Sequence, residues 1–232
     1  MATPRYAIYY APDIDCTLWR VGSSVIGYDA ATCADLPLVA PEGLTIDEWS
    51  AATAEPRRYG FHATLKAPFR LAPGVSENDI LHKLEQFAQE AWCLGEVSLV
   101  PRVLKSFIAL TPESPVPELD ALAARAVVAF EPFRAPLDSA EMKRRLESPL
   151  TPRQRDYLDV YGYPYVFEEF RFHMTLTGSL HCDFRESCLS AISSRLKWEF
   201  GSDVRALVDR VVLFRQESPA DRFRIIHVAT LR

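Results

Sequence analysis

The hydrophobic positions of this chain follow two periods, that of a strand and that of a helix. Ser76 precedes the clearest helix, because Asp79 stands three residues later as in a capping box and apolar residues recur at helical spacing over 80–91. Aromatic and β-branched runs that end at Pro or Gly are typical of strands. The patterns predict strands at 6–10, 59–69, 96–100, 106–111, 170–177, 209–215 and 223–231, and further helices at 117–130, 139–160 (broken by Pro149 and Pro152) and 185–200.

Two segments carry weaker patterns. Residues 13–55 contain Gly, Pro and acidic residues with little periodicity, and only 46–54 indicates a short helix. The stretch YGYPYV at 161–166 is typical of a turn with aromatic walls. No low-complexity linker separates the two halves of the chain.

One five-residue pattern occurs twice. FHATL occupies 61–65 and FHMTL occupies 172–176, and only the middle residue differs. Each copy lies in a predicted strand and is followed by a predicted helix and then by two predicted strands. This imperfect internal duplication indicates an α+β chain with two related lobes, and we expect one bilobal domain over 1–232.

Strand geometry sorts the residues of each copy between two faces. Residues i and i+2 of a strand point to the same side, so His62 and Thr64 share a face, as do His173 and Thr175. A strand from each lobe can therefore present two imidazoles and two hydroxyls to one shared cleft. The opposite face, expected in the core, carries Phe61, Ala63 and Leu65 in the first copy and Phe172, Met174 and Leu176 in the second.

Two imidazoles without a stronger titratable neighbour suit proton transfer in both directions. A neutral histidine accepts a proton from a nucleophile and a protonated one donates to a leaving oxygen, and an ordinary pKa near 6.5 allows both forms. Threonine hydroxyls can donate to the non-bridging oxygens of a phosphoryl group. Lys66 adds a positive charge and, on an ideal strand, shares the face of Thr64. The pattern predicts phosphodiester chemistry without a metal, by in-line attack.

The paired H-x-T signatures, HAT at 62–64 and HMT at 173–175, resemble those of the two-histidine (2H) phosphoesterase superfamily. The longer strings YGFHATLKAPF and YGYPYVFEEFRFHMTLTG resemble its branch associated with phosphonate-utilisation operons, over most of the chain. The resemblance implies two pseudo-symmetric lobes of antiparallel sheet with outer helices around a central cleft. It also implies a catalytic tetrad of His62, Thr64, His173 and Thr175. Superfamily substrates are cyclic phosphates, 2′,5′-linked oligonucleotides or related RNA ends, and for this branch the resemblance implies a small phosphorylated metabolite.

Four residues are candidates for substrate binding. Lys66 is either a phosphate contact or a solvated strand end, and Arg171 shares the cleft face if Phe172 faces the core. Tyr163 and Tyr165 can stack on a base or sugar, or else pack over a lobe as parts of an aromatic turn.

Other charged and metal-ligating residues favour structural interpretations. Arg57 and Arg58 either ring the cleft mouth or lie in an exposed loop, and the basic run at 143–145 is typical of a solvated helix face. His181 with Cys182 and Cys188 lacks the tight spacing of a zinc site. We therefore expect no metal and no cofactor.

The charge and cysteine content of the chain limit the kinds of partner that it is expected to bind. The net charge of -5 argues against a long polyanion bound along a basic face, but it allows a small phosphate ligand in a local positive pocket. Five scattered cysteines without a C-x-x-C motif favour a reducing compartment. With no membrane span and no signal peptide indicated, we expect a cytoplasmic protein whose partner is a small phosphorylated substrate, a nucleotide and an RNA end being candidates.

Three functional hypotheses remain open at this point. The first is a metal-independent phosphodiesterase that opens a cyclic phosphodiester on a small nucleotide or sugar phosphate. The second is a module that binds a phosphorylated metabolite or RNA end in the same cleft without turnover, because no group that orients the histidines is identifiable. The third, a zinc hydrolase, is disfavoured because only two histidines converge.

Overall fold

The computed structural model describes residues 3–41, 43–201 and 203–232. Within them, one antiparallel sheet has the strand order β10-β9-β1-β4-β7-β6-β5-β8, and a small hairpin pairs β2 with β3. The strands are β1 (Arg5–Tyr10), β2 (Tyr28–Asp29), β3 (Ala34–Asp35), β4 (Ala63–Phe69), β5 (Gly95–Leu104), β6 (Phe107–Pro112), β7 (Met174–Thr175), β8 (Val204–Val208), β9 (Arg210–Gln216) and β10 (Arg224–Thr230). The helices are α1 (Thr17–Ile26), α2 (Ile46–Ala52), α3 (Ala54–Arg57), α4 (Glu77–Glu90), α5 (Pro117–Phe130), α6 (Ser139–Leu146), α7 (Pro152–Tyr161) and α8 (Cys182–Phe200), with 3₁₀ turns at Glu131–Phe133 and Phe167–Glu169.

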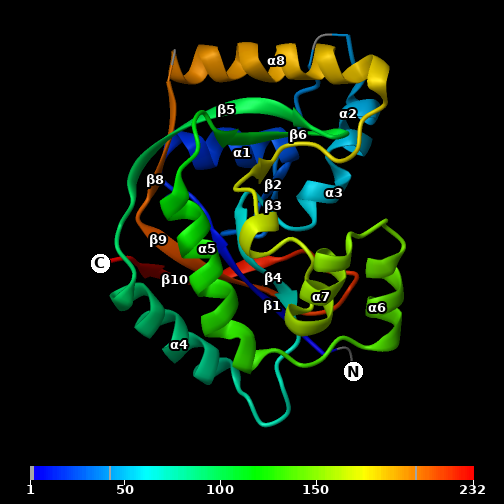
Figure 1. The fold of residues 1–232 in the computed structure, drawn as a ribbon. Helices are drawn as coiled ribbons and strands as arrows, with labels where there is room; N and C mark the ends of the chain where they lie inside the picture. The colour runs from blue at the N-terminus through cyan, green and yellow to red at the C-terminus, as the bar shows by residue number, and fades with distance from the viewer. Residues whose placement is uncertain (1–2, 42, 202) are drawn as a thin grey trace.

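The large sheet consists of two lobes of four strands. One lobe holds β10, β9, β1 and β4, and α4 and α5 pack on it; the other holds β7, β6, β5 and β8, and α8 and α1 pack on it. Figure 1 shows α8 along one end of the molecule above β5 and β6, with α4 at the opposite end. The expected α+β fold with two sheet lobes and outer helices is thus confirmed.

The chain crosses between the lobes. After β4 and α4 it enters the other lobe to form β5 and β6, and after α8 and β8 it returns to form β9 and β10. The two strands predicted after each motif therefore do not belong to the lobe of that motif. The duplicated order of elements arises from two interleaved lobes, which share one continuous sheet.

Several predicted elements agree with the structure in type and position. Ser76 and Asp79 form the capping box at the start of α4, in which each side chain accepts from the other residue's backbone N–H. The helix predicted over 117–130 coincides with α5. The strand predicted over 59–69 begins only at Ala63.

The strand predicted over 170–177 was wrong in extent, because only Met174–Thr175 is in the ladder. The backbone N–H groups of Leu176 and Thr177 both donate to the carbonyl of Ile108, at 2.9 and 3.2 Å. This shared acceptor ends the regular alternation of strand hydrogen bonds. The second motif is consequently held by a short contact rather than a long strand.

Helix α1 and strand β8 were not predicted. Helix α1 contains Gly22, a weak helix former, which made the segment look irregular in sequence. A Cβ at Gly22 would lie 2.3 Å from the ring of Phe61, so the glycine makes room for a fully buried residue of the first motif. The helix buries one face that includes Leu18, Val21 and Val25, and Gly22 lets this face approach Phe61 closely.

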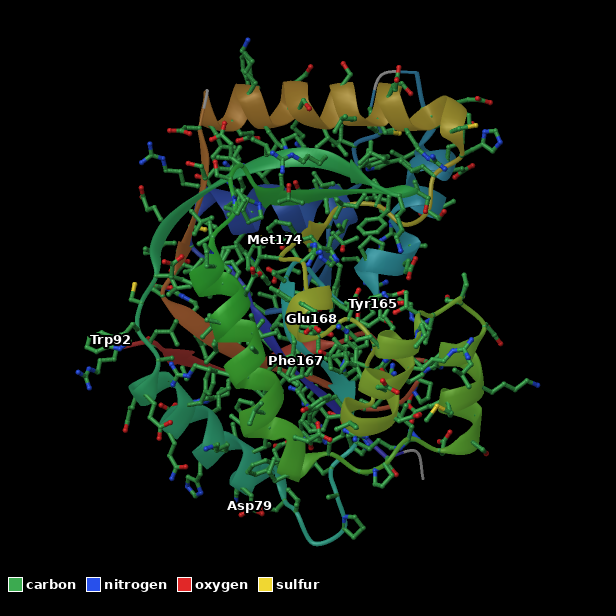
Figure 2. The ribbon with its side chains drawn as sticks, viewed as in Figure 1. Asp79, Trp92, Tyr165, Phe167, Glu168 and Met174 are labelled. Carbon is green, nitrogen blue, oxygen red and sulfur yellow. The ribbon has the colours of Figure 1, made fainter. Side chains whose placement is uncertain are left out.

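The predicted alternation at the motifs is confirmed. The six apolar motif residues are all buried, whereas the histidines and threonines are half-buried on the other face. Figure 2 shows Met174 in the central part of the molecule, while Trp92 and Asp79 lie on its periphery. No helix among the described residues combines the length and apolarity needed to cross a membrane.

Candidate functional site

The two motifs meet in one cleft. His62, Thr64, His173 and Thr175 all line a cleft of about 580 Å³ whose walls come from both lobes. Ala63 pairs with Met174 in an antiparallel register, which places His62 beside Thr175 and Thr64 beside His173. The structure therefore brings together the four residues predicted to share a cleft.

A backbone carbonyl orients each histidine. The Nδ1 atom of His62 lies 2.8 Å from the carbonyl oxygen of Gly60, and the Nδ1 atom of His173 lies 2.7 Å from that of Arg171. A carbonyl only accepts, so each Nδ1 carries the proton and each neutral ring keeps an unprotonated Nε2 for a ligand. The matched geometry, two residues upstream in both motifs, supplies the orienting groups that the sequence did not reveal.

Different neighbours surround the two rings. The ring of Tyr9 stacks on that of His62, with centroids 3.8 Å apart and planes 20° from parallel. Thr64 Oγ1 lies 3.2 Å from His62 Nε2, so its hydroxyl donates to the free ring nitrogen. His173 contacts the ring of Phe107 with a centroid separation of 5.7 Å. His62 is thus the more tightly enclosed of the pair.

The cleft holds both histidines in the neutral form. Burial lowers the pKa of His62 to about 4, opposed by the Gly60 carbonyl and assisted by the nearby His173. Burial also lowers the pKa of His173, opposed by the carbonyl of Arg171. Neither ring has a carboxylate hydrogen-bond partner among the described residues. Both imidazoles are consequently proton acceptors.

The expectation that Lys66 shares the face of Thr64 was wrong. Between the pairs Tyr9–Thr64 and Ile8–Lys66 the register advances by one residue on β1 and by two on β4, which is a β-bulge. The bulge turns Lys66 away from the cleft, where its Nζ donates to the Val127 carbonyl at 3.1 Å and to Glu131 at 2.5 Å. Lys66 is a buried structural cation and lies outside the lining of the cleft.

Arg171 also lies elsewhere than expected. Its guanidinium donates to the carbonyl oxygens of Glu168 and Phe170, at 2.7 and 2.5 Å, and its side chain does not line the cleft. The side chain folds back on its own segment because these carbonyls have no strand partners there. What Arg171 contributes to the site is the backbone carbonyl that holds His173.

The two tyrosines lie in the cleft wall. Tyr163 and Tyr165 both line the cleft, with ring centroids 5.6 Å apart in an edge-to-face arrangement. Figure 2 shows Tyr165 near the centre of the molecule, beside α7. The sequence left open whether these rings face a ligand or pack over a lobe, and their position allows ligand contact.

Most of the positive charge of the cleft comes from arginines that the sequence pattern did not place there. Arg144 and Arg145 line it, although the basic run at 143–145 was interpreted as a solvated helix face. Arg5 and Arg58 line it as well.

Arg57 does not line the cleft, because its guanidinium donates to the carbonyl of Ile26 and to the Ser50 and Thr53 hydroxyls. No local pattern marks the four arginines, since they come from three separate segments.

One group of metal-ligating side chains occurs among the described residues. His181, Cys182 and Asp183 present ligand atoms within 4.8 Å of one another, and all three are exposed. They lie at the start of α8, outside the lining of the cleft. Cys188, considered with them from the sequence, is buried.

Comparisons with known proteins give a family and two relatives. The family model described as "Protein of unknown function (DUF1045)" matches residues 64–224. The chain is 39% identical over 225 residues to a ribose 1,5-bisphosphate phosphokinase PhnN of Janthinobacterium sp. (strain Marseille), covering 94% of this chain and 49% of that protein. It is 33% identical over 231 residues to a protein of the same name from Laribacter hongkongensis (strain HLHK9), covering 98% of this chain and 52% of that protein. The chain thus spans about half the length of these curated relatives.

Proposed function

We propose a function for this chain, which belongs to the DUF1045 family of proteins of unknown function, from the chemistry of its cleft. The function is that of a metal-independent phosphodiesterase that opens a cyclic phosphodiester on a small sugar phosphate or nucleotide. One observation carries the proposal: two histidines, each held through Nδ1 by the carbonyl two residues upstream, line one cleft with a threonine beside each. This arrangement suits acid–base catalysis by both rings.

The reaction uses the two free ring nitrogens in opposite roles. One histidine accepts a proton from water through Nε2 as the water oxygen bonds to phosphorus. The bond from phosphorus to one ring ester oxygen breaks on the opposite side, and the other histidine, protonated, donates its Nε2 proton to that oxygen. Thr64 and Thr175 donate hydrogen bonds to the non-bridging oxygens as their charge increases. The products are a phosphomonoester and a free hydroxyl, and a proton exchanged with solvent restores both rings.

The surroundings of the rings favour His62 as the base. His62 lies under Tyr9, and burial keeps its pKa at about 4, so it stays neutral over the physiological range. His173 has Phe107 as a more distant, tilted ring neighbour, with centroids 5.7 Å apart, and is the better candidate for the protonated role. A bound phosphodiester anion raises the pKa of a nearby imidazole, which allows His173 to carry a proton once substrate is present.

The names of the relatives support a link to phosphorylated-sugar chemistry and to the phosphonate-associated branch that the sequence resembles. They name a kinase, whereas none of the glycines of this chain is followed by the Lys of a Gly-Lys-Ser/Thr phosphate-binding loop. Because the chain matches only about half of each relative, we infer that the kinase activity belongs to the part of the relatives that this chain does not cover.

A second candidate function is capture of a phosphorylated ligand without turnover. The observation that favours it is the lowered pKa of both histidines, since catalysis needs one of them protonated. A binding module would keep its affinity for a phosphorylated ligand when both rings are replaced by glutamine, whereas the enzyme would lose turnover.

The test is turnover of a panel of ribose and nucleoside cyclic phosphates by protein treated with EDTA, followed by ³¹P NMR. The proposal expects conversion of the cyclic phosphorus signal into that of a phosphomonoester for at least one member, at a rate unchanged by chelation. Binding without turnover of any member would favour the second function. Activity that chelation abolishes and zinc restores would contradict the metal-independent mechanism.

A further inference from the structure

We infer that the cleft contains a second anion subsite, formed by Arg144 and Arg145 together with Arg5 and Arg58, and that the substrate carries a phosphomonoester besides its cyclic phosphodiester. The two histidines, which directly precede β4 and β7, and the threonines of these strands act on the cyclic group, and the arginines hold the other phosphate. The inference rests on the proposed function for the identity of the reacting group. It adds the substrate class, a sugar bearing two phosphoryl groups.

Among the described residues, the four arginines have no carboxylate paired directly with them, although most other arginines outside the cleft take part in an ion pair. Arg5 donates to the neutral side chain of Gln216, and Arg58 donates to the carbonyl of Pro219. The described lining of the cleft contains one carboxylate, that of Glu55. A chain with a net charge of -5 therefore places four arginines and one carboxylate around a single cleft.

Arg145 has a donor without a partner. Its Nε atom is buried and makes no hydrogen bond, while its guanidinium lies 4.9 Å from the ring centroid of Tyr163. A buried charged donor is costly unless a ligand or another group accepts from it. Guanidinium groups match the planar, bidentate geometry of phosphate oxygens, so a phosphate is the ligand class that fits this site.

Tyr9 places the arginines relative to the histidines. Its ring stacks on His62, and Arg5 and Arg145 are close enough to oppose the rise in pKa that burial imposes on its phenol. Burial lowers the pKa of Arg5, and Arg144 adds to this effect, against the phenols of Tyr59 and Tyr9 and the carboxylate of Glu141. The arginines and both histidines thus line the same cleft of about 580 Å³, and Tyr9 neighbours both groups of residues, which favours a single small substrate.

The relatives provide an independent argument. Opening a cyclic phosphodiester on a pentose that already carries a phosphomonoester gives a pentose bisphosphate. The relatives that contain a counterpart of this chain are named for a kinase acting on ribose 1,5-bisphosphate. The reaction proposed for the cleft therefore belongs to the class that supplies the substrate of such a kinase. A phosphodiesterase without the arginine subsite would not select a cyclic phosphodiester that also carries a phosphomonoester.

The experiment compares a ribose cyclic phosphate with and without a 5-phosphate, as substrates of the wild-type protein, of the Arg144→Ala/Arg145→Ala variant and of Lys143→Ala. Lys143 lies on the same helix but outside the lining of the cleft, which makes it the matched control. We expect the wild type to prefer the 5-phosphorylated compound in kcat/KM by roughly 10–100-fold, as for one or two charged hydrogen bonds. The double arginine variant should lose most of this preference, mainly through KM, and Lys143→Ala should retain it.

Equal kcat/KM for the two compounds, or a preference that the arginine variant keeps, would overturn the inference. Calorimetric binding of ribose 5-phosphate separates this failure from failure of the proposed function. Binding that the double arginine variant weakens at least tenfold, without turnover of either compound, would support the subsite and contradict the phosphodiesterase. Turnover of either compound, with binding of ribose 5-phosphate unchanged in the double arginine variant, would support the phosphodiesterase and contradict the subsite. Circular dichroism confirms that each variant is folded.

Discussion

Ala63 of β4 pairs with Met174 of β7, and within the described residues this is the one backbone pair that joins the two lobes' motif strands. Both side chains are buried on the core face. Because alternate residues of a strand point to opposite faces, this pair sets both histidines and both threonines on the cleft side. The position of the catalytic candidates thus depends on one register, and a slip of β7 by one residue would turn His173 and Thr175 toward the core.

A good leaving group should reveal which histidine is the acid. Replacing His173 with Ala removes the proposed proton donor, so the natural alkoxide leaving group is expelled poorly, with a loss of ~10²–10⁴-fold. A p-nitrophenyl phosphodiester releases p-nitrophenolate, which leaves without protonation. We expect the activity of the same variant on this substrate to fall by less than about tenfold. His62→Ala, lacking the base, should be impaired on both substrates. Steady-state kinetics on both substrates checks this prediction. If His62→Ala spared the p-nitrophenyl substrate and His173→Ala did not, the two roles would be exchanged.

Gly60 is expected to be irreplaceable for the orientation of His62. Its φ of +82° favours glycine, and a Cβ there would lie 2.6 Å from the Cβ of buried Ala30. Ala at this position costs about 1–2 kcal/mol for the backbone alone, and relief of the clash moves the carbonyl that holds Nδ1 of His62. We expect a lower melting temperature and a kcat reduced by at least about tenfold.

Gly74→Ala is the matched control for this substitution. Gly74 has a φ of +83°, but a Cβ there would meet nothing within 4 Å. It should therefore carry the backbone cost without the clash, and leave kcat unchanged. Identical melting temperatures and activities for the two variants would show that the Gly60 carbonyl does not position the ring.

Lys66→Met should weaken the fold without changing substrate affinity. The substitution leaves the Val127 carbonyl without its donor and removes the ion pair with Glu131, which keeps Arg134 as a partner at 2.7 Å. We expect the free energy of unfolding to fall by about 1–3 kcal/mol, measured by urea denaturation. KM should stay within about twofold of the wild-type value. Loss of a lysine that binds the phosphate of the substrate would instead raise KM by roughly tenfold or more.

Acid should destabilise the protein partly through His62. Burial lowers the pKa of this ring to about 4 in the folded state, against 6.5 for an ordinary histidine. Between these values the unfolded chain binds the proton and the folded chain does not, so the free energy of unfolding falls as the pH falls. His62→Gln should lose less stability than the wild type between about pH 7 and about pH 4.5.

His82→Gln is the control for this pH dependence, because His82 is exposed on α4. Urea denaturation at several pH values should give the wild-type pH dependence for His82→Gln and a flatter one for His62→Gln. Parallel curves for all three proteins would mean that His62 does not resist protonation in the folded state.

The sequence indicated the tetrad and offered Tyr163, Tyr165 and Arg58 as possible cleft residues, but it did not indicate the other arginines of the cleft, for physical reasons. The duplicated pattern is local, so alternation placed His62 and His173 on one face. Lys66 was misplaced because a bulge needs the register of the partner strand, which no local pattern contains. Arg5 and Arg145 reach the cleft from β1 and α6, and only the packing of distant segments brings them together. Helix α1 was missed because Gly22 interrupts its apolar face, and the close contact with Phe61 that requires this glycine is not visible in the sequence.

The most direct test of the account is the activity of His62→Gln, His173→Gln and the double variant on the best cyclic phosphate found, in the presence of EDTA. Two rings that act as one catalytic unit give non-additive losses, so each single variant should lose nearly as much kcat as the double variant, with melting temperatures close to the wild-type value. Losses that multiply independently, or a single variant that retains activity while folded, would contradict a shared two-histidine active site.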